Sequence, residues 1–118
     1  MVNKALELAK KDNPDHEAIS QLGEGWTGDE ALAIAIYCAM RHLDSVEDAI
    51  IASVNHDGDS DSTGSVCGNI MGAIYGYEHI KERNIFCPEE CTLEDVLELS
   101  EVTLAMADDL YVGCVQWA

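Results

Sequence analysis

The chain has 118 residues and a mass of 12.8 kDa, which allow a single domain with a modest core over residues 1–118. Its 23 acidic and 6 basic side chains give a formal net charge of −17. Because so negative a surface repels phosphate backbones, nucleic acid is not an expected partner. The longest apolar run, Ala31–Met40, is half of what a membrane span needs, and no charged and then apolar leader follows Met1, so we expect a cytoplasmic protein without a membrane partner.

The start of the chain predicts two short helices and a loop. Helical spacing of apolar residues covers residues 3–11. A second short helix is expected over Asp15 to Leu22, and Pro14 just before it is suited to the first helical position. The loop Gly23-Glu24-Gly25-Trp26 follows. From the residues alone, a plug of the hydrophobic core is one interpretation of its tryptophan, neither favoured nor disfavoured.

A strongly apolar helix comes after this loop. Thr27 and Glu30 have the spacing of a capping box, which opens a helix from Gly28 to about Leu43. Apolar residues lie on several sides of this helix, so we expect it at the centre of the fold. His42 stands at its C-terminal end, where the helix dipole favours a surface histidine.

The next helix leads into an acidic loop. Ser45 is expected to cap it, and it runs from Val46 to about Asn55. Its inward residues are predicted to be Ile50, Ile51 and Val54.

The acidic loop has the composition of a site for a hard cation. Carboxylates at alternate positions stand beside hydroxyl groups, namely Asp57, Asp59 and Asp61 beside Ser60, Ser62 and Thr63. Carboxylates this close repel one another unless a cation or backbone N–H groups neutralise them, and oxygen ligands suit Mg²⁺, Mn²⁺ or Ca²⁺ better than zinc. The alternative is a solvated turn whose side chains only cap nearby N–H groups.

Spacing argues against two other metal sites. With Asp57 as the first ligand of an EF-hand, the sixth and twelfth positions need Gly and Glu, but Ser62 and Gly68 stand there. The segment 87–91, Cys-Pro-Glu-Glu-Cys, lacks the second cysteine pair of a zinc knuckle even with His79 nearby, so incidental thiols are the better interpretation. Five cysteines at irregular spacing are expected to be reduced.

A glycine-rich helix is expected directly after the acidic loop. Glycines recur at every fourth position, at Gly64, Gly68, Gly72 and Gly76. Each costs about 1 kcal/mol relative to alanine in a helix interior, so we expect another helix to pack closely against this bare ridge. The helix is predicted to reach Ile80.

The last predicted helix runs from Leu93 to about Val112, with Thr92 as its cap. No stretch of the chain alternates polar and apolar residues as a half-buried strand does. The predicted fold class is therefore all-α, a compact bundle of about five to six helices.

Two segments carry a resemblance to a known family. The run Asn-His-Asp-Gly-Asp-Ser-Asp-Ser-Thr-Gly from Asn55 to Gly64, with the glycine-rich helix behind it, resembles the C-terminal metal motif of the ADP-ribosylglycohydrolases of the dinitrogenase-reductase-activating type. The segment Leu-Gly-Glu-Gly-Trp at residues 22–26, leading into the helix from Glu30, is similar to that family's upstream loop and helix. The resemblance runs from about Ala5 to Gly113.

The resemblance implies a site for ADP-ribose and divalent cations. Asp59, Asp61 and Ser62 match positions that hold such an ion, which is Mg²⁺ in most members, with Mn²⁺ as an alternative. Asp57 is implied to face the ligand or to lie just behind the metal ligands, and the loop Gly23–Trp26 to lie along the ribose and phosphates. Family members hydrolyse the glycosidic bond that joins ADP-ribose to a protein side chain.

The match covers the C-terminal portion of the family pattern. The other metal ligands, a Thr-Asp-Asp type motif, and the catalytic acidic residue belong to an N-terminal portion that nothing in Met1–Gln21 resembles. We therefore assign no catalytic residue. Two carboxylates and one hydroxyl leave most of the coordination of Mg²⁺ to water, which predicts weak binding by this chain alone.

Three functions stay open on this basis. The first is a hydrolase of ADP-ribosylated protein that acts with a separate N-terminal half, and the second is a non-catalytic module for divalent metal or ADP-ribose. The third is a self-associating remnant whose acidic loop is vestigial. Helices that normally pack against the N-terminal portion would expose apolar surface, so we expect a homo-oligomer.

Overall fold

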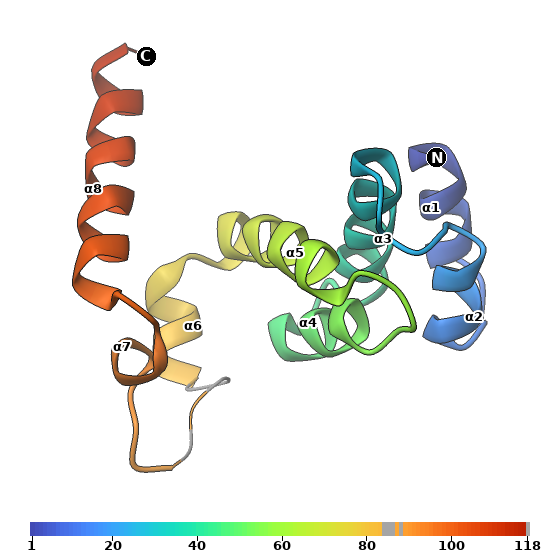
Figure 1. The fold of residues 1–118 in the computed structure, drawn as a ribbon, viewed down its shortest axis with the longest axis horizontal. Helices are drawn as coiled ribbons and strands as arrows, with labels where there is room; N and C mark the ends of the chain where they lie inside the picture. The colour runs from blue at the N-terminus through green and yellow to red at the C-terminus, as the bar shows by residue number, and fades with distance from the viewer. Residues whose placement is uncertain (84–86, 88, 118) are drawn as a thin grey trace. The chain divides into compact units, whose positions relative to one another are not determined.

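The computed structural model describes residues 1–83, 87 and 89–117, and this described part is built from helices (Figure 1). It contains eight helices and no strand. They are α1 (Val2–Ala9), α2 (Asp15–Ser20), α3 (Gly28–Arg41), α4 (Val46–Val54), α5 (Ser60–Tyr75), α6 (Tyr77–Arg83), α7 (Leu93–Val96) and α8 (Ser100–Trp117). The predicted all-α class is confirmed. Within the described ranges, no helix has the length and apolar character to cross a membrane.

The chain divides into two units. The first covers residues 1–80 and contains α1 to α5 with the start of α6, and the second begins at Lys81. The single domain expected from the length stays a prediction.

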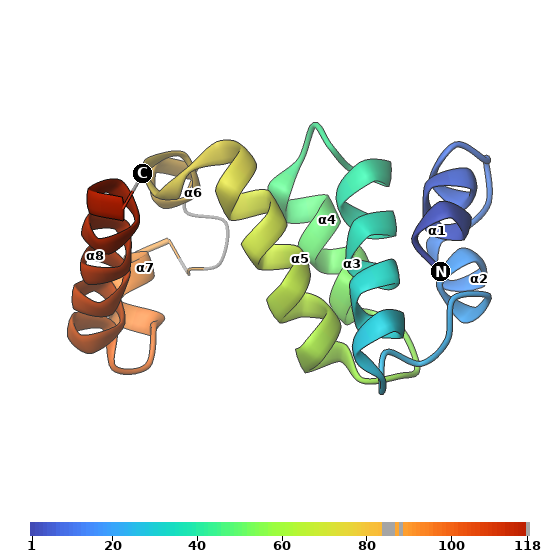
Figure 2. The same ribbon diagram turned by 90° about the horizontal axis from the view of Figure 1, so that it is seen from above.

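Helix α3 is the centre of the first unit. It packs against α1, α4 and α5, and also touches α2; Figure 2 shows it between the α1–α2 pair and the α4–α5 pair. Its buried residues are mostly small, namely Ala31, Ala33, Ile34, Ala35, Tyr37, Cys38 and Ala39. Small side chains let neighbouring helices approach closely. The central position predicted for this helix is confirmed.

The start of α2 and the capping of α3 differ from the predictions, although α3 begins at Gly28 as predicted. Pro14 takes the cap position, with ψ at 142°, and α2 begins one residue later. Thr27 makes no side-chain hydrogen bond to the helix backbone, and its hydroxyl instead donates to Asp29 Oδ1 at 2.6 Å. The Glu30 carboxylate accepts a hydrogen bond from the backbone N–H of Glu24 at 3.3 Å. Glu30 thus ties α3 to the preceding loop instead of closing a capping box.

Helix α4 buries a different set of residues from the predicted one. Ile51 is 49% exposed, so its predicted inward position is wrong. Ile50 is half-buried, and Val54 is 41% exposed although its Cγ1 lies near Gly64 of α5. The buried residues are Val46, Ala49, Ala52 and Ser53. The segment is apolar on more than one side, so its helical pattern alone could not show which face packs against α3 and α5. The cap by Ser45 is confirmed, because its hydroxyl accepts from the Asp48 N–H at 3.2 Å.

The glycine ridge of α5 is closely packed at one end only. A Cβ built on Gly64 would lie 2.6 Å from Val54 Cγ1, whereas on Gly68 it would lie 3.8 Å from Ile50 Cδ1, an ordinary contact. A Cβ built on Gly72 would meet no atom of the described residues within 4 Å other than those of its chain neighbours and its own helix backbone. The predicted close packing therefore holds at the start of α5 and fails further along. Gly76, with φ at +83°, ends the helix before the predicted limit.

The helix predicted from Leu93 to Val112 is divided into α7 and α8. Leu99, between them, has φ at +51°, a left-handed conformation that is uncommon outside glycine. The cap by Thr92 is confirmed, since Thr92 and Asp95 form a capping box at the start of α7.

Apolar side chains in the second unit are largely exposed, among them Leu99, Val102, Met106, Leu110, Tyr111, Val112 and Val115. Exposed apolar surface was expected without a particular location, and self-association stays a prediction.

Candidate functional site

Two loops that are distant in the sequence lie against each other. Residues 23–26 lie within the connection 21–27 between α2 and α3, and residues 55–59 connect α4 to α5. The backbone N–H of Asp59 donates to the carbonyl oxygen of Glu24 at 2.6 Å. A Cβ built on Gly58 would lie 2.0 Å from that same carbonyl oxygen, so only glycine permits this approach. The two segments that resemble the family motifs therefore form one continuous surface.

Gly25 joins the first loop to the start of α5. Its φ of +77° favours glycine, and a Cβ at this position would lie 2.7 Å from Thr63 Cγ2. Gly25 and Thr63 are both buried. Thr63 lies in the first turn of α5 together with Asp61 and Ser62, so one buried contact relates the first loop to the acidic turn.

Trp26 is 81% exposed. This exposure excludes the interpretation of Trp26 as a plug of the hydrophobic core. Its indole extends from the same loop whose backbone contacts Asp59 and Thr63. Contact between Trp26 and a ligand stays a prediction.

Asp59, Asp61 and Ser62 form a cluster of oxygen atoms at the start of α5. The Ser62 hydroxyl donates to Asp59 Oδ2 at 3.0 Å, and the Ser62 backbone N–H donates to Asp61 Oδ1 at 3.0 Å. The adjacent Asp61 carboxyl raises the pKa of Asp59 above its ordinary value. The Asp59 carboxyl and the Ser62 N–H lower the pKa of Asp61. The two carboxyl groups therefore compete for one proton and titrate as a pair.

This set of donors fits a hard cation. Two carboxylates that compete for a proton, together with a hydroxyl, offer the oxygen ligands that Mg²⁺ and Mn²⁺ prefer. Among the described residues, no group of three or more His, Cys, Asp or Glu side chains is placed to hold a metal ion. Asp57 thus does not complete a group of three with Asp59 and Asp61. The described residues supply only part of a coordination shell.

A pocket of about 510 Å³ lies between α2 and the two loops. Its lining includes His16 and Glu17 from α2 and Glu24, His56 and Asp57 from the loops. The volume is within the range of small-molecule sites, about 300–1,000 Å³. The structure thus brings Asp57 to one cavity with Gly23 and Glu24, whereas Trp26 and the oxygen cluster of Asp59, Asp61 and Ser62 are not part of its lining. No motif in the sequence pointed to the participation of α2.

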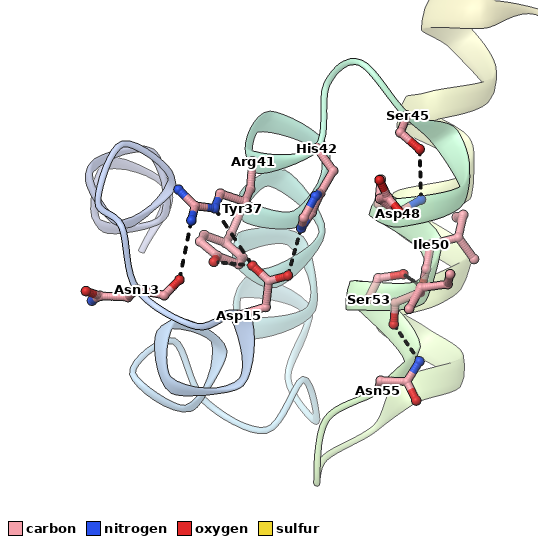
Figure 3. A network of polar contacts seen from close by, with 12 residues as sticks. Asn13, Asp15, Tyr37, Arg41, His42, Ser45, Asp48, Ile50, Ser53 and Asn55 are labelled. Atoms are coloured by element: carbon pink, nitrogen blue, oxygen red, sulfur yellow. Dashed lines mark hydrogen bonds and ion pairs between the residues drawn. The ribbon is translucent and has the colours of Figure 1, made fainter.

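Helix α2 is held in place by a polar network around Asp15, drawn in Figure 3. Tyr37 Oη donates to Asp15 Oδ1 at 2.7 Å, and His42 Nε2 lies 2.7 Å from Asp15 Oδ2. Arg41 Nη1 donates to the carbonyl oxygen of Lys11 at 2.7 Å, which ties the end of α3 to the segment before α2. His42 was expected as a surface residue that the helix dipole favours. It is instead partly buried against Asp15.

The network also sets the ionisation of Asp15. Burial by itself would raise the pKa of its carboxyl group, but the hydrogen bonds with Tyr37 and His42 and the charges of His42 and Arg41 outweigh burial. The pKa of Asp15 consequently lies below its ordinary value. The ionised carboxylate is the form that holds α2 to α3.

His56 is a residue of the site whose role its sequence pattern did not predict. Its Nε2 lies 2.8 Å from Thr63 Oγ1, and the backbone N–H of Gly58 donates to its Nδ1 at 3.1 Å. The available signal was its place inside the acidic loop, two residues before a glycine and seven before a threonine. Such spacing suggests a hydrogen bond between the His56 side chain and a nearby backbone group. It does not predict the hydrogen bond between His56 and Thr63 on α5.

Comparison with known proteins decides the family. The profile of the ADP-ribosylglycohydrolase family matches residues 1–117. The chain belongs to the ADP-ribosylglycohydrolase family. The resemblance seen in the acidic loop and in the loop 23–26 is thereby confirmed at the level of the family.

The matched relatives are three ADP-ribosylhydrolases named ARH3. The protein of Bos taurus is 30% identical over 92 residues, which cover 69% of this chain and 25% of the relative. Those of Mus musculus and Homo sapiens are 33% and 32% identical over 76 residues, 56% of this chain and 20% and 21% of the relatives. The chain thus spans a quarter or less of the length of these relatives. No solved structure was found to match it.

Proposed function

We propose that this chain provides the divalent-cation and ADP-ribose binding part of an ADP-ribosylglycohydrolase. The reaction is hydrolysis of the glycosidic bond between ADP-ribose and a protein side chain. The observation that supports the proposal is the hydrogen bond of 2.6 Å from Asp59 to Glu24, which unites the acidic turn with the loop 23–26. The names of the matched relatives, ADP-ribosylhydrolases, support the substrate class.

In this proposal the oxygen cluster holds the cation. Asp59, Asp61 and Ser62 are its ligands for Mg²⁺ or Mn²⁺, and the affinity of this chain alone is weak because the coordination shell is partial. A bound cation would supply positive charge that fixes the ribose hydroxyl groups and favours attack of water at the anomeric carbon. Asp57 and the loop Gly23–Trp26 bind the rest of the ADP-ribosyl group, and of these residues Asp57, Gly23 and Glu24 line the pocket.

The chain holds and orients the sugar, and its partner performs the proton transfers. Asp59 and Asp61 are occupied as metal ligands, so neither is free to act as the general base. A separate N-terminal half is the proposed source of the catalytic acidic residue and of the missing metal ligands. The exposed apolar residues of α8 provide surface for self-association or for that partner.

A non-catalytic binding module is the second candidate. It is favoured by the partial coordination shell, since the described residues contain no group of three metal-binding side chains. Such a module would bind ADP-ribose or ADP-ribosylated protein without hydrolysing the glycosidic bond.

Calorimetry with Mg²⁺ and ADP-ribose tests the proposal. We expect Mg²⁺-dependent binding by the wild-type chain, its loss in Asp59→Asn and Asp61→Asn, and no change in Asp108→Asn, which removes the same charge from exposed α8. Binding that is equal in all four proteins would remove the acidic loop from the site. Release of ADP-ribose from a modified protein, measured with candidate N-terminal partners added, then separates the hydrolase from the module.

A further inference from the structure

Both ring nitrogens of His56 have a defined partner. The backbone N–H of Gly58 points to Nδ1 at 3.1 Å, and Thr63 Oγ1 lies 2.8 Å from Nε2. A backbone N–H can only donate a hydrogen bond, so Nδ1 must be the acceptor and carries no hydrogen. The ring hydrogen is therefore on Nε2, which donates to Thr63. The contact with Gly58 thus selects one neutral tautomer of the imidazole.

The hydroxyl of Thr63 continues this chain of hydrogen bonds. It has one hydrogen to donate, and its shortest acceptor is the carbonyl oxygen of Ser53 at 2.6 Å. The carbonyl oxygens of Asp59 and Ser60 lie further away, at 3.2 and 3.3 Å. Thr63 thus donates to Ser53 and accepts from His56. Every bond in the series from Gly58 to Ser53 has a fixed direction.

The series connects the three elements that meet at the site. Ser53 belongs to the last turn of α4, His56 and Gly58 to the acidic loop, and Thr63 to the first turn of α5. Thr63 and Ser53 are fully buried, so water does not compete for these bonds. The methyl group of Thr63 also contacts Gly25. The buried Thr63 therefore accepts a hydrogen bond from His56 through its hydroxyl and lies against Gly25 of the loop 23–26 through its methyl group.

We propose that His56, in its Nε2–H tautomer, is a positioning residue of the binding site. It fixes the turn that presents Asp57 and Asp59 and, through Thr63, fixes that turn relative to α5 and to the loop 23–26. This inference rests on the proposed function, because its consequence is a higher affinity for ADP-ribose and Mg²⁺ in the positioned site. His56 acts through other residues and does not touch the cation.

Nuclear magnetic resonance of the unliganded chain tests the tautomer directly. We expect the nitrogen spectrum of the His56 ring to show an acceptor-type Nδ1 and a hydrogen-bearing Nε2. A hydrogen on Nδ1 would overturn the inference. This measurement needs no ligand, so it remains decisive even if the chain binds no ADP-ribose.

Paired substitutions test the positioning role. Asn at this position keeps an acceptor near the place of Nδ1, and Gln keeps a donor near the place of Nε2, so His56→Asn and His56→Gln each retain one of the two bonds. One lost hydrogen bond is expected to weaken Mg²⁺-dependent ADP-ribose binding about five-fold, and His56→Ala, which loses both, about 25-fold. His79→Ala is the matched control, because His79 stacks on Tyr75 at the other end of α5.

The outcomes separate the two proposals. If His56→Ala binds ADP-ribose in the presence of Mg²⁺ as tightly as the wild type does, the positioning role is overturned and the proposed function is unaffected. If the wild type itself binds nothing, the proposed function fails, and the amide resonances of Glu24, Gly58 and Asp59 decide the inference. They should shift in His56→Gln and stay in place in His79→Ala, and unchanged resonances in a folded His56→Gln would overturn it. Circular dichroism shows that each variant is folded.

Discussion

The backbone N–H of Asp59 donates to the carbonyl oxygen of Glu24 at 2.6 Å, and this bond joins the acidic loop to the loop that precedes α3. Neither residue needs its side chain for it. The contact instead depends on Gly58, whose missing Cβ leaves room for the carbonyl oxygen. The order of glycine and aspartate in this loop thus has a structural reason that is independent of metal binding.

Gly58→Ala should separate the two loops. The added Cβ would lie 2.0 Å from a backbone oxygen, which cannot rotate away as a side chain could. We expect the free energy of unfolding to fall by about 1–3 kcal/mol, as in overpacked sites, and ADP-ribose binding to fall more than about ten-fold. Urea denaturation and calorimetry measure the two effects. Gly113→Ala in α8 is the control, since a Cβ there meets no atom of the described residues within 4 Å apart from its chain neighbours and its own helix backbone.

The two ends of the glycine ridge should respond oppositely to alanine. At Gly64 the added Cβ would lie 2.6 Å from Val54 Cγ1, and at Gly72 it has open space. Gly72→Ala should raise the free energy of unfolding by about 0.5–1 kcal/mol, because alanine is the better helix former. Gly64→Ala should lower it, because Val54 must move. Equal stabilisation by both variants, measured by urea denaturation, would contradict the close packing of α4 on α5.

The clustering of oxygen atoms at the start of α5 could be predicted from the sequence because it depends on local composition, whereas metal binding by this cluster stays a prediction. Asp59, Asp61 and Ser62 lie within four consecutive residues, so a turn of any conformation brings their oxygen atoms close together. The all-α class was readable for a similar reason, because helical spacing is a local property of the chain. The helix caps at Ser45 and Thr92 also depend on residues only three positions apart.

Properties that depend on tertiary contacts could not be read in this way. Glu30 has capping-box spacing from Thr27, but its carboxylate binds the Glu24 N–H because the loop folds back onto α3. His42 follows the dipole rule, yet it turns toward Asp15 of a different helix. The partner of His56 lies on α5, beyond the turn that contains the histidine. In each case a polar group has a local and a distant partner available, and only the packing of the helices decides between them.

The network at Asp15 predicts a pH-dependent stability. Because the pKa of Asp15 in the folded chain lies below that in the unfolded chain, about 3.9, its carboxylate stabilises the fold at all higher pH values. This contribution is lost as the pH falls through the folded pKa. Asp15→Asn should lower the free energy of unfolding by about 1–2 kcal/mol at neutral pH. The difference from wild type should shrink below about pH 4.

Urea denaturation at a series of pH values measures this difference. Asp44→Asn serves as the control, since Asp44 is exposed at the end of the α3–α4 connection. Tyr37→Phe should reproduce part of the effect of Asp15→Asn, because it removes the hydroxyl that donates to Asp15 at 2.7 Å. A loss of stability in Asp15→Asn that stays constant from neutral pH to about pH 2 would show that the charge of the carboxylate is not its cause.

Substitution of Trp26 should change the affinity for the ligand without changing the stability of the fold. Its side chain is 81% exposed, so Trp26→Ala should change the free energy of unfolding by less than about 0.5 kcal/mol. Stacking of a base on an aromatic ring contributes about 1–3 kcal/mol, and if the indole stacks on the adenine of ADP-ribose, its loss weakens binding by about five-fold or more. Tyr111→Ala removes an aromatic ring that is 71% exposed in the second unit and should leave binding unchanged. Equal affinity of Trp26→Ala and wild type, with equal stability, would place the ligand away from this indole and restrict the proposed site to the pocket beside α2.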